Sequence, residues 1–174
     1  MKSNVVLIGF MGTGKTSVGK RLAQILGYSF FDTDLEVEKV TGLTITEIFT
    51  RFGETRFRAE EILVVKKIAA TRNSVIATGG GVVLNPDNVI NLKQNGILIW
   101  LQATPEKILA RTQSDHRRPL LKKRKSISLI SSFLEQRSLF YQQSADYEVD
   151  TSALNPDQVV ATILSLLPCL KHID

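Results

Sequence analysis

A glycine-rich loop with the pattern G-x-x-x-x-G-K-[ST] lies near the start of the chain, at Gly9, Gly14, Lys15 and Thr16. An apolar run at residues 5–8 precedes it, and a helical amphipathic pattern follows. In such a loop, the backbone N–H groups turn toward phosphate oxygens, and the helix N-terminus adds partial positive charge. Lys15 would reach the outer phosphates and the Thr16 hydroxyl would ligate Mg²⁺. The pattern therefore predicts a loop that binds a nucleoside triphosphate.

Two acids lie at the end of the next apolar stretch, residues 29–32. Asp32 is its last residue, and Asp34 follows two positions later. Ligands of open parallel sheets bind beyond the carboxyl ends of the strands. The strand expected at 75–78 ends in glycine, so Asp32 is the leading candidate to support Mg²⁺ through bound water. Asp34 then remains to orient an acceptor hydroxyl and take its proton. The alternative for Asp34 is the N-cap of the following helix.

A triple glycine, Gly79, Gly80 and Gly81, follows the strand expected at 75–78. Without side chains, these residues let a substrate approach the main-chain N–H groups closely. The alternative is a flexible turn without a ligand.

Three arginines complete the candidate chemistry: Arg58, Arg118 and Arg137. A guanidinium presents its donors as a planar fork that suits a carboxylate. Arg58 has Glu61 within one helical turn to orient it, and Arg137 lies on the helix expected at 127–143. For each of these two, a surface salt bridge is the alternative. Arg118 lies in a polar segment, about residues 112–125, whose length is typical of an active-site lid, and it would stabilise transition-state charge.

Strand and helix patterns alternate along the chain, which predicts an α/β fold with a parallel sheet and helices on both faces. The predicted strands are 5–8, 29–32, 75–78, 97–101 and 147–149; the predicted helices are 15–26, 34–41, a short one from 44, 53–71, one from 85, 104–111, 127–143 and one from 155. At 174 residues, we expect one domain, residues 1–174.

Composition excludes several classes of protein. No apolar run is long enough for a membrane span, and the first strand begins too early for a signal peptide. The basic run 122–125 has no interleaved aromatic residues, which argues against nucleic-acid binding. ATP and a small carboxylate would account for the net charge of +5. A single cysteine, Cys169, excludes an internal disulfide, and we expect a cytoplasmic protein.

Taken together, the motifs resemble those of shikimate kinases. The resemblance rests on GFMGTGKT at 9–16, FDTD at 31–34, FRAEE at 57–61, TGGG at 78–81, RRPLL at 117–121 and EQR at 135–137. It implies a monomer with the P-loop NTPase, nucleoside monophosphate kinase-like fold, a three-layer sandwich around five parallel strands. A substrate-binding helical segment would span about residues 34–61. The implied reaction transfers the ATP γ-phosphate to the 3-hydroxyl of shikimate, in the chorismate pathway to aromatic amino acids.

The same resemblance implies roles for individual residues. Asp34 would bind the ring hydroxyls and act as base, Arg58 and Arg137 would hold the shikimate carboxylate, Arg118 would close over ATP, and Arg111 would stack on adenine. The ATP phosphates would lie against Gly12, Thr13, Gly14, Lys15, Thr16 and Ser17, with Mg²⁺ held by Thr16 and Asp32. The acceptor pocket would include Gly79, Gly80, Gly81, Phe49, Phe57 and Glu61. Leu154 replaces an arginine of some relatives in the adenine loop, so only a backbone contact is expected there.

Three other readings of the sequence stay open. Another small-molecule kinase of this fold, such as a gluconate kinase, has less need of paired arginines beside a triple glycine. A nucleoside monophosphate kinase would need a second nucleobase pocket, which is not evident. A non-catalytic nucleotide-binding module should have lost Lys15, Asp34 or Arg118, and all three are present.

Overall fold

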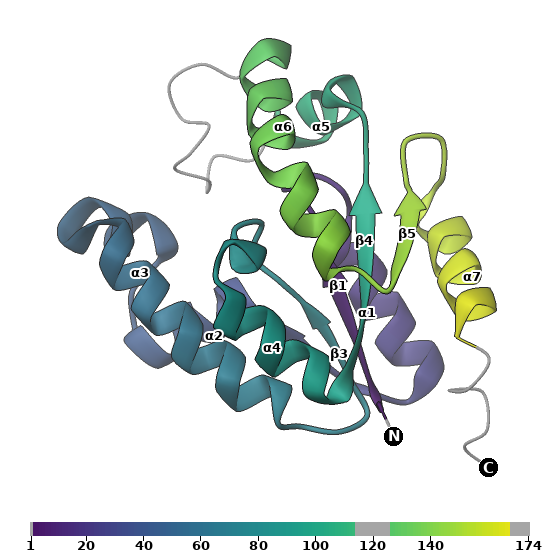
Figure 1. Cartoon of the computed structure of the whole chain (residues 1–174), viewed down its shortest axis with the longest axis horizontal. Helices are drawn as coiled ribbons and strands as arrows, with labels where there is room; N and C mark the ends of the chain where they lie inside the picture. The colour runs from purple at the N-terminus through teal and green to yellow at the C-terminus, as the bar shows by residue number, and fades with distance from the viewer. Residues whose placement is uncertain (1, 114–125, 168–174) are drawn as a thin grey trace.

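A five-stranded sheet in which all strands pair in parallel lies at the centre of the computed structural model, which describes residues 2–113 and 126–167 (Figure 1). The strands are β1 (Asn4–Ile8), β2 (Ser29–Asp32), β3 (Ser74–Ala77), β4 (Gly96–Gln102) and β5 (Tyr147–Asp150), in the spatial order β2-β3-β1-β4-β5. The chain therefore leaves β1 toward one edge and later returns to build the other. Such a reversal of strand order marks the place where α/β sheets bind ligands.

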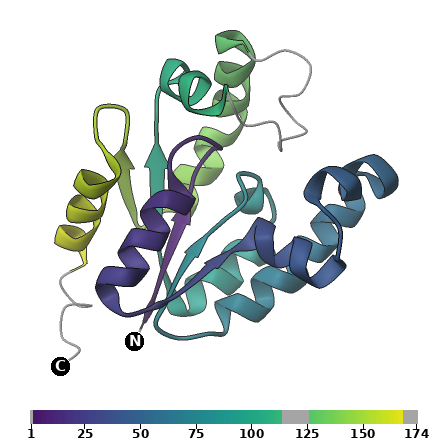
Figure 2. The same cartoon turned by 180° about the vertical axis from the view of Figure 1, so that it is seen from behind.

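Side chains of the buried strands alternate between two apolar cores. Each face of the sheet has its own layer of helices (Figures 1 and 2). Val5 and Leu7 pack with α1 (Lys15–Leu26) and α7 (Pro156–Leu166). Val6 and Ile8 belong to the opposite core, which draws on α2 (Thr33–Thr41), α3 (Ile45–Ala69), α4 (Pro86–Asn95) and α6 (Ile127–Ser144). The prediction of a parallel sheet covered on both faces is confirmed.

A third apolar cluster fixes the loop that follows β1. Phe10 and Met11 of this loop pack with Ile108 of α5 (Pro105–Thr112) and Ile130 of α6. Each of the four side chains is at most 6% exposed. Packing against α5 and α6, which come much later in the sequence, therefore fixes the position of the loop.

Several predicted helix starts appear with their side-chain caps, including the reciprocal capping box of Thr44 and Glu47 at α3. The two helices expected from residue 44 and over 53–71 form one element, α3, broken at Gly53. Gly53 has φ 80° and ψ 177°, a combination that is essentially confined to glycine. The break lets the two parts of α3 point in different directions beside the acceptor side of the site described below.

Two further findings bear on the sequence predictions. Over residues 2–113 and 126–167, no helix combines the length and apolar character that crossing a bilayer requires. Thr112, near the start of the expected lid, is the buried last residue of α5, and residues 114–125 of that segment lie outside the described residues. Arg118, the basic run 122–125 and Cys169 lie outside the described residues.

Candidate active site

Two adjoining cavities open at the carboxyl ends of the central strands. The first, which we call the nucleotide cavity, is lined by residues 12–17, Arg111, Thr151 and Leu154. The second, the acceptor cavity, is lined by Phe49, Phe57, Arg58, Glu61, Gly79, Gly80, Gly81 and Arg137. Thr16, Asp32 and Asp34 line both. The structure therefore brings the predicted residues of the described chain to one composite site, with the two acids where its halves meet.

The phosphate loop between β1 and α1 wraps around its lysine. Lys15 is 8% exposed, and its Nζ donates to the carbonyl oxygens of Gly9 and Phe10, both at 2.7 Å. Gly14 precedes the first turn of α1 with φ 97°, a left-handed conformation that glycine adopts at low cost. The start of α1 and the Lys15 charge therefore lie together at the nucleotide cavity, as an anion site requires.

Asp32 connects the two halves of the site through both of its carboxylate oxygens. Oδ2 accepts from the Thr16 hydroxyl at 2.8 Å, and Oδ1 accepts from the Asp34 backbone N–H at 3.1 Å. Asp32 is therefore the N-cap of α2, and the alternative that Asp34 is the cap is wrong. With Asp34 in the first turn instead, its carboxylate lies against Gly79: a Cβ there would fall 2.6 Å from Oδ1.

The oxygen atoms of Thr16 and Asp32 are of the type that Mg²⁺ prefers. Among the described residues, no group of three or more His, Cys, Asp or Glu side chains is placed to hold a metal. This donor set fits an ion that takes few protein ligands and completes its shell with phosphate and water oxygens. It does not fit a metal held by protein ligands alone.

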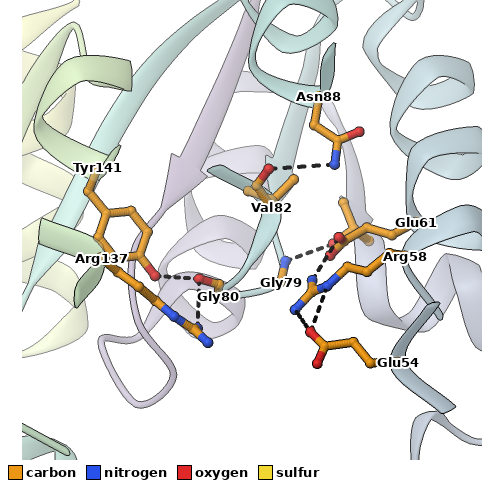
Figure 3. A network of polar contacts seen from close by, with 10 residues as sticks. Glu54, Arg58, Glu61, Gly79, Gly80, Val82, Asn88, Arg137 and Tyr141 are labelled. Atoms are coloured by element: carbon orange, nitrogen blue, oxygen red, sulfur yellow. Dashed lines mark hydrogen bonds and ion pairs between the residues drawn. The ribbon is translucent and has the colours of Figure 1, made fainter. Parts of the chain in front are cut away.

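Arg58 on α3 is held between two glutamates of the same helix (Figure 3). Its Nη1 donates to Oε2 of Glu61 at 2.9 Å, the contact expected from their spacing. Its Nε and Nη2 both donate to Oε1 of Glu54, at 3.1 and 2.9 Å. Sequence reasoning missed Glu54, although its position four residues before Arg58 is a recognisable ion-pair spacing. The salt-bridge alternative for Arg58 therefore holds, inside the acceptor cavity and not on a distant surface.

Glu61 is a buried acid at the wall of the acceptor cavity, 1% exposed. Burial raises the pKa of Glu61 and outweighs the opposite effect of Arg58, and nearby Asp34 raises it further. Burial would lower the pKa of Arg58, but Glu61 and Glu54 outweigh it and raise that pKa. Within the described part of the chain, Oε1 of Glu61 has no hydrogen-bond partner. This end of the cavity thus holds a fixed cation beside an under-satisfied carboxylate.

The turn formed by the triple glycine is held at several points, and Figure 3 shows those at Gly79 and Gly80. The Gly79 N–H donates to the Thr33 hydroxyl at 2.8 Å, and the Gly80 carbonyl accepts from the Tyr141 phenol at 2.5 Å and from Arg137 Nη1 at 3.2 Å. A Cβ on Gly81 would fall 2.5 Å from Nη2 of Arg58. Gly79 and Gly81 are therefore needed for space, because the charged groups of Asp34 and Arg58 lie where their side chains would begin. The reading as a flexible turn is not supported.

Arg137 of α6 lies beside a stacked pair of aromatic rings, Phe10 and Phe133, whose centres are 6.2 Å apart. Its guanidinium carbon is 5.7 Å from the ring centre of Phe10 and 5.4 Å from that of Phe133. Arg137 is 8% exposed, which contradicts the alternative of a surface salt bridge. Phe10 belongs to the phosphate loop, and Arg137 lines the acceptor cavity. Their contact therefore connects the two halves of the site, as the two acids do. Contacts of a cation with ring faces stabilise and orient the guanidinium.

Tyr141, one turn after Arg137, is a further residue that sequence reasoning missed. It is fully buried, and its ring stacks on Trp100 of β4 with 5.5 Å between ring centres. Burial raises the pKa of Tyr141 to about 12, so the phenol remains a donor to the Gly80 carbonyl at neutral pH. The i, i+4 spacing from Arg137 was the available signal, since such pairs share one helix face.

Two phenylalanines form an apolar wall of the acceptor cavity, as expected. The rings of Phe49 and Phe57 lie 4.9 Å apart, on either side of the break at Gly53. Arg58 lies 5.2 Å from the centre of the Phe57 ring.

Arg111, at the far end of the nucleotide cavity, joins α5 to the chain after β5. Its guanidinium donates to the Thr151 hydroxyl at 3.0 Å and to the Thr151 carbonyl at 2.7 Å. The Thr151 hydroxyl in turn donates to the Thr13 carbonyl of the phosphate loop at 3.2 Å. Thr151 belongs to the segment 149–156 that resembles the adenine loop of the family. Sequence reasoning gave Thr151 no role of its own, because its contacts join residues far apart in the chain. Leu154 lines the cavity.

Comparisons with known proteins agree with this geometry. The family model described as "Shikimate kinase" matches residues 11–168. A shikimate kinase of Pelotomaculum thermopropionicum is 51% identical over 98% of this chain and 99% of its own length. The structure of Acinetobacter baumannii shikimate kinase in complex with shikimate has a TM-score of 0.93 and 36% identity, covering 99% of this chain and 97% of that one. Shikimate kinase from Aquifex aeolicus gives a TM-score of 0.81 at 36% identity, over 94% and 95%.

Proposed function

The chain belongs to the shikimate kinase family and is an ATP-dependent phosphotransferase of aromatic amino acid biosynthesis, and we propose a role for each part of its site in this reaction. The proposed site phosphorylates shikimate at the 3-hydroxyl. The observation that supports the proposal is the junction of the two cavities at Thr16, Asp32 and Asp34. A γ-phosphate on one side and an acceptor hydroxyl on the other would meet at this junction. Positioning of this kind supplies much of the catalysis of phosphoryl transfer.

On the nucleotide side, the N–H groups of residues 12–17 and the Lys15 ammonium would hold the phosphates and spread their charge. On the acceptor side, Arg58 and Arg137 would bind the shikimate carboxylate as two forks. Gly79, Gly80 and Gly81 would present main-chain groups, and Phe49 and Phe57 would cover the apolar part of the ring. Asp34 would accept a hydrogen bond from the acceptor hydroxyl and take its proton as the phosphoryl group transfers.

Mg²⁺ would be held by the Thr16 hydroxyl, with Asp32 behind it. When bound, the ion supplies neutralisation of the negative charge on the phosphates. The chain's own contribution is the hydrogen bond between Thr16 and Asp32, which fixes the hydroxyl at the junction of the cavities. The expected adenine contacts of Arg111 and of the backbone near Leu154 also belong to this proposal.

The remaining expectations are part of the same proposal. Arg118, outside the described residues, would close over the phosphates with a lid at about residues 112–125 and exclude water from the reaction. The protein would act as one domain over residues 1–174, as a cytoplasmic monomer with ATP and shikimate as its partners, and without nucleic acid or membrane.

An ADP-release assay that offers shikimate, gluconate and a nucleoside monophosphate side by side tests the acceptor. We expect ATP-dependent turnover with shikimate alone, because only shikimate presents both a ring hydroxyl and a carboxylate to this cavity. Lys15→Met serves as the control for phosphate transfer and should reduce the signal with every acceptor. Equal turnover with gluconate, or release of ADP that does not depend on an acceptor, would contradict the proposed function.

A further inference from the structure

Arg58 already holds a carboxylate on one edge of its fork. Nε and Nη2, the pair of donors that suits a side-on carboxylate, both donate to Oε1 of Glu54, while Nη1 donates to Glu61 (Figure 3). Glu54 therefore occupies, through one oxygen, the donor edge of Arg58 that an acceptor carboxylate would engage with both of its oxygens.

The two glutamates on Arg58 differ in how easily they can be exchanged. Glu61 is 1% exposed, so removal of its partner would leave a buried charge uncompensated. The Glu54 side chain is 58% exposed, and exposed ion pairs are weak because water can replace either partner. Of these two contacts, the one with Glu54 is the one that an incoming anion can displace at low cost.

The local fold explains why Glu54 lies beside Arg58. Gly53 interrupts α3, so Glu54 opens the second part of the helix, where a negative side chain is favoured by the helix dipole. A glutamate four residues before an arginine is also the favourable order for an i, i+4 ion pair. The position is therefore set by the backbone, independently of any bound molecule.

We propose that Glu54 competes with the acceptor carboxylate for Arg58 and thereby weakens the binding of anionic acceptors. This inference rests on the proposed function, in which Arg58 binds that carboxylate. With both glutamates ionised, the group of Glu54, Arg58 and Glu61 carries two negative charges and one positive charge. An acceptor carboxylate must either displace Glu54 from the fork or bind beside a group that is net negative. Neutralising Glu54 favours the acceptor in both cases.

The Glu54→Gln variant tests the competition, since it keeps the shape of the side chain and removes its charge. We expect the KM and Kd for shikimate to fall about two- to fivefold, the range that loss of a partly exposed ion pair allows. The KM for ATP should not change, because Glu54 does not line the nucleotide cavity. Both constants are measured by the ADP-release assay and by calorimetric titration with shikimate.

Glu60→Gln is the matched control. Glu60 pairs with Arg56 at 2.6 Å on the same helix, and neither residue lines the acceptor cavity. The variant makes the same change in net charge, and we expect a wild-type KM for shikimate. An equal fall in both variants would assign the effect to long-range charge and overturn the inference.

A shikimate KM in Glu54→Gln at or above the wild-type value also overturns it, since Glu54 would then be idle or would hold Arg58 in place for the acceptor. Arg58→Ala separates this outcome from a failure of the proposed function. A raised KM in Arg58→Ala beside an unchanged KM in Glu54→Gln rejects the competition alone. A wild-type KM in Arg58→Ala removes Arg58 from the acceptor site and rejects both the competition and the proposed role of Arg58 in holding the shikimate carboxylate.

Discussion

The nucleotide and acceptor cavities share one rim but are built in different ways. Residues 12–17, the centre of the nucleotide cavity, are contiguous and use backbone groups, one lysine and a helix start. The acceptor cavity takes Asp34 from α2, Arg58 from α3, Gly80 from the turn after β3 and Arg137 from α6. The phosphate-binding groups thus come from one segment of the chain, whereas those of the acceptor side are brought together by packing between several elements. Single side-chain changes should therefore affect acceptor binding more selectively than nucleotide binding.

The largest effect is expected where the two cavities meet. Asp34→Asn should lower kcat about 10²- to 10⁴-fold, the usual contribution of a general base. The Kd for ATP should stay close to the wild-type value, because the contiguous loop does not need this carboxylate. Steady-state kinetics and ATP titration together measure the two effects. Loss of ATP binding with normal turnover at saturating ATP would show that Asp34 belongs to the nucleotide side.

A moderate effect is expected from a residue that acts only through the acceptor turn. Tyr141→Phe keeps the ring stacked on Trp100 and removes the hydrogen bond to the Gly80 carbonyl. Since a hydrogen bond contributes about 0.5–1.5 kcal/mol, the KM for shikimate should rise about two- to tenfold, with the KM for ATP unchanged.

Tyr147→Phe, on the exposed edge strand β5, is the control for loss of a phenol and should have wild-type kinetics. A lower melting temperature in Tyr141→Phe without any change in the KM for shikimate would reduce Tyr141 to a structural role. Equal increases in both KM values would mean that the two cavities are less separable than their construction suggests.

The smallest effect concerns the pH dependence of stability on the acceptor side. The pKa of Glu61 is raised above its ordinary value of 4.5 in the folded protein, so folding favours the protonated acid. The resulting stabilisation is present below about pH 4.5 and is lost as the pH rises through the folded pKa. The free energy of unfolding of wild type relative to Glu61→Gln should therefore fall from acidic pH toward neutral pH. Urea unfolding of both proteins between pH 4 and 7 measures this difference, and a constant or increasing difference would contradict the prediction.

Much of the fold was predictable because the signals are local. Each end of the five strands lies within one residue of its predicted limit. Proline and cap residues at 85–86, 104–105 and 155–156 also begin helices as predicted. The two helices predicted around Gly53 are contiguous and form the two parts of α3, with the break at the non-helical Gly53 itself. The alternative of Asp34 as N-cap was wrong because Asp32, with its β-region backbone, takes that position.

By itself, the sequence determined the identity and chemistry of the phosphate loop, because eight consecutive residues carry the motif. It also supplied the residue types of the acceptor side. Only the tertiary structure decided how those residues are used: the Gly80 carbonyl meets Arg137 and Tyr141 from 57 and 61 positions away, and Arg58 shares its donors between one buried and one exposed glutamate. The physical reason is that hydrogen-bond partners and burial are set by the packing of helices against the sheet, which local spacing does not encode.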